Sequence, residues 1–164
     1  MSESHGGTVE TDERQAFTRF VKETEPRLSY ALAAAYGFET GAEATADALA
    51  WAWEHWESLQ KKRNPAGYLY RVGQSKARRY HRSQMFFPLV PVPEAPSVEP
   101  GLIPALASLT QNQRVAVVMI HGMGYSEREV ADLLGLSRWS VRTHAERGMR
   151  RLRNALGVTT DATR

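Results

Sequence analysis

The stretch of sequence that decides the fold is residues 126–153, SEREVADLLGLSRWSVRTHAERGMRRLR. Ser126 and Glu129 have the spacing of a capping box, which predicts that a helix begins here. Gly135 follows the apolar end of this helix, where glycine takes a left-handed turn without a steric cost. Ser137 then caps a second helix. Two short capped helices joined by a glycine turn predict a helix-turn-helix.

The second of these helices is amphipathic. Its apolar residues recur at intervals of three and four, as on the buried face of a helix, and they are Val141, Ala145, Met149, Leu152 and Leu156. Arginines occupy the other faces. Such a helix can pack on its partner and still offer positive charge to the major groove of DNA. An ordinary helical hairpin with solvated arginines is the alternative, but caps at both helix starts favour the helix-turn-helix.

The composition excludes several classes of protein. The chain of 164 residues has no cysteine, so it forms no disulfide and no thiolate metal site. Its histidines lack metal-ligand spacing, and we find no phosphate-binding glycine loop and no nucleophile–base pair. We therefore expect no cofactor, no metal ion and no catalytic residue. No apolar run approaches the roughly 20 residues of a membrane span, and the N-terminus is polar rather than signal-like, which favours a cytoplasmic protein.

Charge is distributed unevenly along the chain. Residues 61–82 contain eight basic residues and no acidic residue, whereas residues 1–60 are acidic overall. A second basic zone covers the helix-turn-helix, and an acidic stretch separates the two. Two separate basic zones favour two contacts with a polyanion such as nucleic acid.

The pattern predicts an all-α chain of two small helical domains joined by an extended, proline-rich linker. Residues 1–11 are polar and are expected to be disordered. The first domain covers 12–83, the linker 84–104 and the second domain 105–157, and 158–164 form a C-terminal tail. The linker holds six of the eight prolines, which argues against helix and strand.

Three helices are expected in the first domain, over 12–37, 41–59 and 64–82. Pro26 removes a backbone donor and should kink or split the first helix. Asn64, followed by a proline, should cap the third. In the second domain, Thr110 and Gln113 form another capping box, ahead of a helix that stops near Gly122.

The third helix interleaves aromatic and basic residues. Rings can stack on unpaired bases while cations follow the backbone, which is what a single-stranded nucleic acid needs. Tyrosines buried in the core are the alternative. The candidate residues are Arg71, Lys76, Arg78, Arg79, Tyr80 and Arg82.

The second helix carries three tryptophans within six residues. Trp53 and Trp56 share a face with Leu49, whereas Trp51 points away from it. An exposed Trp51 would be a candidate protein contact, because tryptophan dominates the energetics of interfaces. A Trp51 covered by the first helix is the alternative.

Several motifs resemble the sigma-70 family, specifically its small extracytoplasmic-function type. Residues 109–114 (LTQNQR) resemble the family's Leu-Pro-x-x-Gln-Arg, and residues 125–137 (YSEREVADLLGLS) its Tyr/Leu-Ser-x-x-Glu-Ile-Ala-x-x-Leu-Gly-Ile-Ser. Residues 141–142 and 147–153 resemble its Val-Lys/Arg and Arg-Ala-Arg-x-x-Leu-Arg. In the first domain, the segments PRL (26–28), AWEHW (52–56) and PAGYLYRV (65–72) resemble its Pro-x-Leu, Ala-Trp-x-x-Trp and Pro-x-x-Trp-Leu-Tyr-Arg-Ile. The likeness covers roughly 13–82 and 105–156.

The resemblance implies a sigma factor, which binds core RNA polymerase and directs promoter-specific initiation. The second domain would place its last helix in the major groove of the -35 element, through Arg138, Trp139, Ser140, Arg142, Thr143 and Arg147. The first domain would hold the unpaired strand of the -10 element through the third-helix residues above. It would dock on the polymerase clamp through Asp47, Trp51, Glu54 and His55, and the second domain would contact the flap. An anti-sigma factor is a further partner that the family often has.

The chain departs from the family pattern in its first domain. Ala46 and Asp47 stand where the family often has Gln-Glu, and Gln74, Ser75 and Arg79 replace its Arg-Asn and a following Asp. Two other functions stay open. One is a stand-alone helix-turn-helix regulator that binds its site without polymerase, usually as a dimer. The other is a sigma-like protein that binds polymerase or a regulator without reading DNA.

Overall fold

A computed structural model of the chain describes residues 6–81 and 99–158. Within these ranges the chain forms helices and turns and no strand, which confirms the predicted all-α class. The helices are α1 (Gly6–Tyr36), α2 (Phe38–Glu54), α3 (Trp56–Gln60), α4 (Pro65–His81), α5 (Leu102–Ala107), α6 (Gln111–Val117), η1 (Val118–Gly122), α7 (Glu127–Leu134) and α8 (Arg138–Ala155). Arg82, most of the predicted linker and most of the predicted tail lie outside the described residues.

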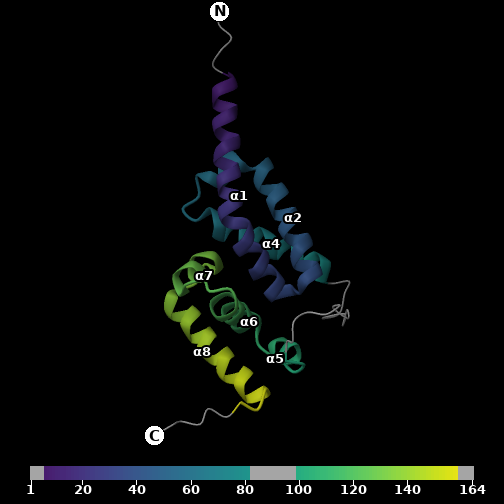
Figure 1. Cartoon of the computed structure of the whole chain (residues 1–164). Helices are drawn as coiled ribbons and strands as arrows, with labels where there is room; N and C mark the ends of the chain where they lie inside the picture. Colours follow the sequence, from purple (N-terminus) through teal and green to yellow (C-terminus); the bar gives the residue numbers. More distant parts are fainter. Residues whose placement is uncertain (1–5, 82–98, 159–164) are drawn as a thin grey trace, which may run out of the picture.

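Helices α1, α2 and α4 pack together as the first half of the chain (Figure 1). Leu28 and Leu32 of α1 are fully buried, as are Ala44 and Ala48 of α2 and Leu69 of α4. Alanine side chains let neighbouring helices approach closely, so the alanine-rich sequence of α2 suits a helix packed on two sides.

Helix α1 differs from the prediction at its start and at Pro26. It begins at Gly6, so residues 6–11 are helical rather than disordered, and it continues through Pro26 to Tyr36. Pro26 lies on the exposed side, whereas Leu28 is completely buried. Burial of the opposite face offsets the roughly 3 kcal/mol that a proline costs inside a helix. The helix ends at Gly37, as predicted, where φ is 92°.

The predicted second helix is interrupted at His55, which separates α2 from α3. His55 has φ −117° and ψ 20°, and its ring atom Nδ1 lies 2.9 Å from the carbonyl oxygen of Trp51. Beyond the break, Trp56 is buried, with its ring centroid 5.3 Å from that of Phe17. Trp56, the first residue beyond the break, thus belongs to the core of the first half.

The second half contains the predicted helix-turn-helix. Both capping boxes are present, one at Thr110 before α6 and one at Ser126 before α7. Gly135 takes the left-handed conformation with φ 66°, and Ser137 caps α8 by accepting a hydrogen bond from the backbone of Ser140. These local predictions are confirmed.

Two local features of the second half were not predicted. Helix α5 begins at Leu102, so the last residues of the predicted linker, including Pro104, are helical. Proline is tolerated there because the first turn of a helix makes no backbone hydrogen bond through those N–H groups. The helix that follows Thr110 changes at Val118 from an α-helix to the π-helical turn η1, which ends at Gly122.

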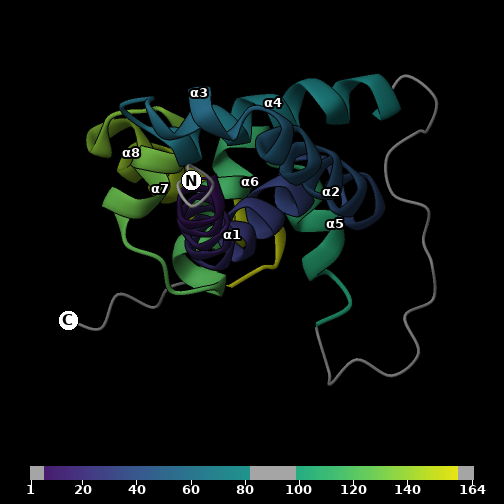
Figure 2. The same ribbon diagram turned by 90° about the horizontal axis from the view of Figure 1, so that it is seen from above.

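The two halves pack against each other and share a hydrophobic core, and Figure 2 shows them from above. Helix α1 contacts α6 and η1, and α4 contacts α7. Val115 and Met119 are buried in the same cluster as Leu28 of α1. Asn64 caps α4 by accepting from the backbone of Gly67, as predicted, and it also donates to the carbonyl oxygen of Asp132 in α7 at 2.6 Å.

Candidate nucleic-acid interface

The first turns of α8 present three of the predicted duplex-reading residues to solvent. Arg138, Trp139 and Arg142 are all exposed, and 74% of the surface of Trp139 is accessible. Val141 and Ala145 belong to the buried face of the helix. The apolar face thus fixes α8 on its partners while the basic face stays open.

The other three predicted residues have a different placement. The hydroxyl of Ser140 lies 2.9 Å from that of Ser137, within the cap, and Thr143 donates to the carbonyl oxygen of Trp139 at 2.9 Å. Arg147 is exposed, but its position is roughly 180° around the helix from Arg138. Arg138 and Arg142 therefore share one side of α8, and Arg147 lies on the other side from Arg138.

Arg142 forms an ion pair that sequence reasoning missed. Its Nε and Nη2 atoms donate to the two carboxylate oxygens of Glu127, each at 3.0 Å. These bonds lower the pKa of Glu127 and raise the pKa of Arg142. Glu127 belongs to α7 and Arg142 to α8, so the pair depends on how the two helices cross, which the spacing in the sequence does not indicate.

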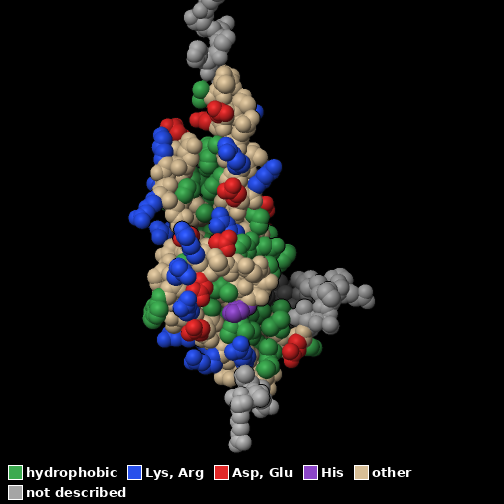
Figure 3. Space-filling view, turned by 60° about the vertical axis from the view of Figure 1, so that its left-hand side comes forward, with side chains coloured by type: hydrophobic (Ala, Val, Ile, Leu, Met, Phe, Trp, Pro, Cys, Tyr) green, Lys and Arg blue, Asp and Glu red, His purple; other side chains and the backbone are tan. Residues whose placement is uncertain are grey.

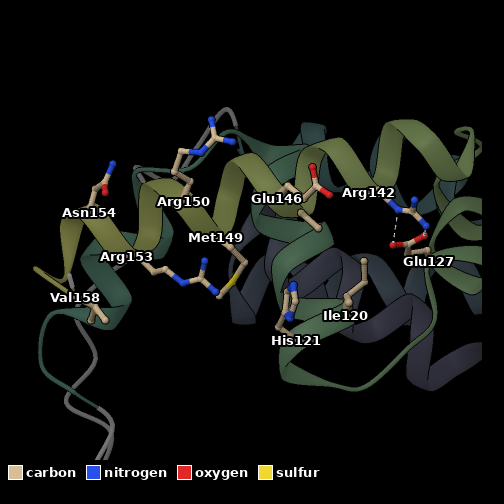
Figure 4. A pocket seen from close by; sticks show the side chains of 11 residues that line it. Ile120, His121, Glu127, Arg142, Glu146, Met149, Arg150, Arg153, Asn154 and Val158 are labelled. Atoms are coloured by element: carbon tan, nitrogen blue, oxygen red, sulfur yellow. Dashed lines mark hydrogen bonds and ion pairs between the residues drawn. The ribbon is translucent and has the colours of Figure 1, made fainter. Parts of the chain in front are cut away.

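Basic side chains are spread over the face that carries α7 and α8, with acidic side chains between them (Figure 3). A groove of about 670 Å³ runs along α8 on its η1 side (Figure 4). Its lining includes Ile120, His121, Met149, Arg150, Arg153 and Val158. Arg142, Glu127 and Glu146 also line the groove, so charges of both signs border its apolar surface.

The predicted single-strand residues of α4 do not share one face. Arg78 lines a hollow of about 510 Å³ between the two halves, and Arg71 reaches the turn at Gly135 in the second half. Tyr80 lies on the other side of α4 and donates to a carboxylate oxygen of Asp47 at 2.5 Å. This hydrogen bond raises the pKa of Tyr80. Lys76 is half-buried and Arg79 exposed, whereas Arg82 lies outside the described residues.

The predicted polymerase-binding residues, Asp47, Trp51, Glu54 and His55, follow one stripe of α2 and its end. The ring of Trp51 stacks on that of His55, with centroids 4.3 Å apart, and lies 5.7 Å from the ring of Tyr68. Trp51 is half-buried, and the rings of His55 and Tyr68 cover part of it. Of the three tryptophans between residues 51 and 56, the exposed one is Trp53, at 49%, which sequence reasoning placed on the inner face.

Within 6–81 and 99–158, no group of three or more His, Asp or Glu side chains could hold a metal ion. Among the described helices, none combines the length and the apolar character that crossing a lipid bilayer requires.

Comparison with known proteins gives two matches. Residues 102–152 match the family model described as "Sigma-70, region 4". The fold is shared with the sigma factor RpoE from Bartonella quintana, solved in complex with the anti-sigma factor NepR, with a TM-score of 0.64 and 22% identity over 88% of this chain and 98% of that chain. No curated protein sequence matches the chain. Residues 102–152 are thus similar to sigma-70 region 4, and the chain as a whole shares the fold of a solved sigma factor.

Proposed function

We propose that this chain binds core RNA polymerase and directs it to a two-part promoter, with the second half of the chain reading the -35 element and the first half the -10 element. The observation that carries the proposal is the exposed start of α8, where Arg138, Trp139 and Arg142 project from a capped helix-turn-helix. Arginine forks match the acceptors of guanine in the major groove, and apolar side chains contact the thymine methyl group. Arg147 would contact phosphate, which sets position rather than sequence.

The first half would hold the unpaired strand of the -10 element. Its supporting feature is the basic helix α4, on which Arg71, Arg78 and Arg79 are exposed and Tyr80 is 38% exposed. Cations along the strand and a ring for base stacking are the two parts of a sequence-tolerant single-strand site. Since Arg71 and Arg78 face the second half, they become fully available to DNA only when the halves separate.

Two protein contacts complete the proposal. The stripe of Asp47, Trp51, Glu54 and His55 would dock on the polymerase clamp, and the groove along α8 would receive the polymerase flap. An anti-sigma factor is the proposed regulator, because the relative RpoE was solved with one. These assignments support a cytoplasmic location.

The proposal is tested by selection from a random-sequence duplex library, with the full chain alone and with the full chain bound to core polymerase. We expect a motif of two separated boxes that is recovered only with core polymerase. Recovery of one motif by the chain alone, unchanged by polymerase, would instead indicate a stand-alone regulator. Association with polymerase without any motif would indicate a sigma-like protein that does not read DNA.

A further inference from the structure

The pair between Glu127 and Arg142 has a geometry that goes beyond an ordinary surface contact. Two parallel hydrogen bonds join the guanidinium to the carboxylate, as drawn in Figure 4. A forked contact of this kind fixes the plane of the guanidinium as well as its position. The side chain of Glu127 is 28% exposed and that of Arg142 is 56% exposed. The side chain of the acid is therefore less exposed than that of the base.

The fork occupies only one edge of the guanidinium. Arginine has five N–H donors, and the bonds to Glu127 use those of Nε and one of Nη2. Among the residues that the structure describes, none accepts a hydrogen bond from Nη1. The remaining edge, formed by Nη1 and Nη2, has the spacing that matches the O6 and N7 acceptors of guanine.

We infer that Glu127 is a positioning residue that presents the free edge of Arg142 to a guanine of the upstream element, and so sets the base preference there. This inference rests on the proposed function. A free arginine loses rotamer entropy when it is ordered on a base, and a pre-formed fork reduces that loss. Glu127 thereby acts on specificity without touching DNA.

Two other charged side chains lie close to the pair, but neither forms a hydrogen bond with it. Arg138 lies near Glu127 and Glu146 near Arg142, where each acts through space, without a hydrogen bond to the pair. A role that depended only on net charge would be shared by Glu127 and Glu146. A role that depends on the fork belongs to Glu127 alone, so Glu146 provides the matched control.

The test measures base preference, position by position, for the full chain bound to core polymerase, using the duplex library described above. Glu127→Gln keeps the length of the side chain but replaces one acceptor oxygen with a donor, which breaks the fork. We expect Glu127→Gln and Arg142→Ala to lose preference for guanine at the same position, by roughly fivefold or more. Adding Glu127→Gln to Arg142→Ala should change little further. Glu146→Gln should leave every preference unchanged.

Three outcomes would overturn the inference. Glu127→Gln could change affinity equally for all sequences, which would make Glu127 an electrostatic competitor or a purely structural residue. Arg142→Ala could leave all base preferences intact, or Glu146→Gln could reproduce the effect of Glu127→Gln. In each case the wild-type chain still recovers its motif, so the proposed function stands. If the wild-type chain recovers no motif with polymerase, the result contradicts the proposed function itself. Thermal melting of each variant shows whether folding is unchanged.

Discussion

The Nη2 atom of Arg114, in α6, donates a hydrogen bond to the carbonyl oxygen of Ala35, at the end of α1, with a length of 3.0 Å. The same guanidinium donates from Nε to Ala34 and from Nη1 to Leu109. The last carbonyl groups of a helix have no partner within that helix. Arg114 supplies partners for two of them from the other half of the chain, and it is itself only 5% exposed.

Arg114 is therefore predicted to be important for stability. Arg114→Ala would leave buried carbonyl groups without a donor, which should lower the free energy of unfolding by about 3 kcal/mol. Arg114→Lys keeps the charge but cannot make three divergent hydrogen bonds. Its free energy of unfolding should lie between those of the wild type and Arg114→Ala. Urea denaturation measures both, with Arg150→Ala, at an exposed arginine, as the control. A loss below about 0.5 kcal/mol for Arg114→Ala would contradict this role.

The capping box of α7 predicts a pH dependence of stability. Glu129 accepts hydrogen bonds from the backbone and the hydroxyl of Ser126, at 2.8 Å and 2.9 Å, which lower its pKa. The folded state thus binds a proton less readily than the unfolded state, whose glutamate pKa is about 4.3. The stabilisation is present above that value and is lost as the pH falls through the lowered pKa.

This prediction is measured by thermal melting between about pH 6 and pH 3. Glu129→Gln should reduce the loss of stability with acid, because glutamine accepts the same hydrogen bonds without titrating. Glu25→Gln, at an exposed acid of α1, is the control. If the melting temperatures of the wild type and Glu129→Gln fell equally with pH, the carboxylate of Glu129 would not contribute to the pH dependence of stability.

Replacement of Trp139 is predicted to weaken DNA binding without lowering the stability of the fold. Because 74% of its surface is accessible, Trp139→Ala should change the free energy of unfolding by no more than about 0.5 kcal/mol. Promoter binding by the polymerase complex should nevertheless weaken, roughly tenfold, through loss of an apolar base contact. Fluorescence anisotropy with a labelled promoter duplex measures the affinity. A strongly destabilised variant would mean instead that Trp139 is structural.

The packing of the two halves predicts that they must separate at a promoter. The -10 and -35 elements lie roughly 85 Å apart along the duplex, at 3.4 Å per base pair. Helix α4 has 17 residues and spans about 25 Å, and its cap, Asn64, donates a hydrogen bond to Asp132 in α7. In the packed form, the two proposed DNA contacts are thus too close together to reach both elements.

A reversible crosslink tests this prediction. The chain contains no cysteine, so Asn64→Cys with Asp132→Cys, at two exposed neighbouring positions, introduces the only thiols. A short bifunctional methanethiosulfonate reagent would join them before core polymerase is added. We expect transcription to be lost in the crosslinked chain and restored by dithiothreitol, with each single-cysteine variant as control. Full activity of the crosslinked chain would mean that the halves need not separate.

Sequence reasoning worked best where a few adjacent residues determine the structure. The two capping boxes, the left-handed Gly135 and the cap at Ser137 each depend on contacts within a turn, and all were predicted. Pro26 was misjudged because its local cost is outweighed by the burial of the other face of α1.

The interactions that sequence reasoning missed join residues far apart in the chain. Arg114 reaches Ala35 across the contact between the halves, and Glu127 reaches Arg142 across the crossing of α7 and α8. In neither pair does the separation of the two residues in the sequence indicate that they are in contact. The break at His55 likewise has no signal in the apolar periodicity of α2.

The central claim is that this chain directs polymerase to promoters, and run-off transcription tests it most directly. Purified core polymerase is combined with genomic fragments, with and without the full chain, and the transcripts are mapped. We predict specific start sites that appear only when the chain is present and that weaken with Trp139→Ala. Specific DNA binding by the chain alone, with no new transcript in the presence of core polymerase, would contradict the claim.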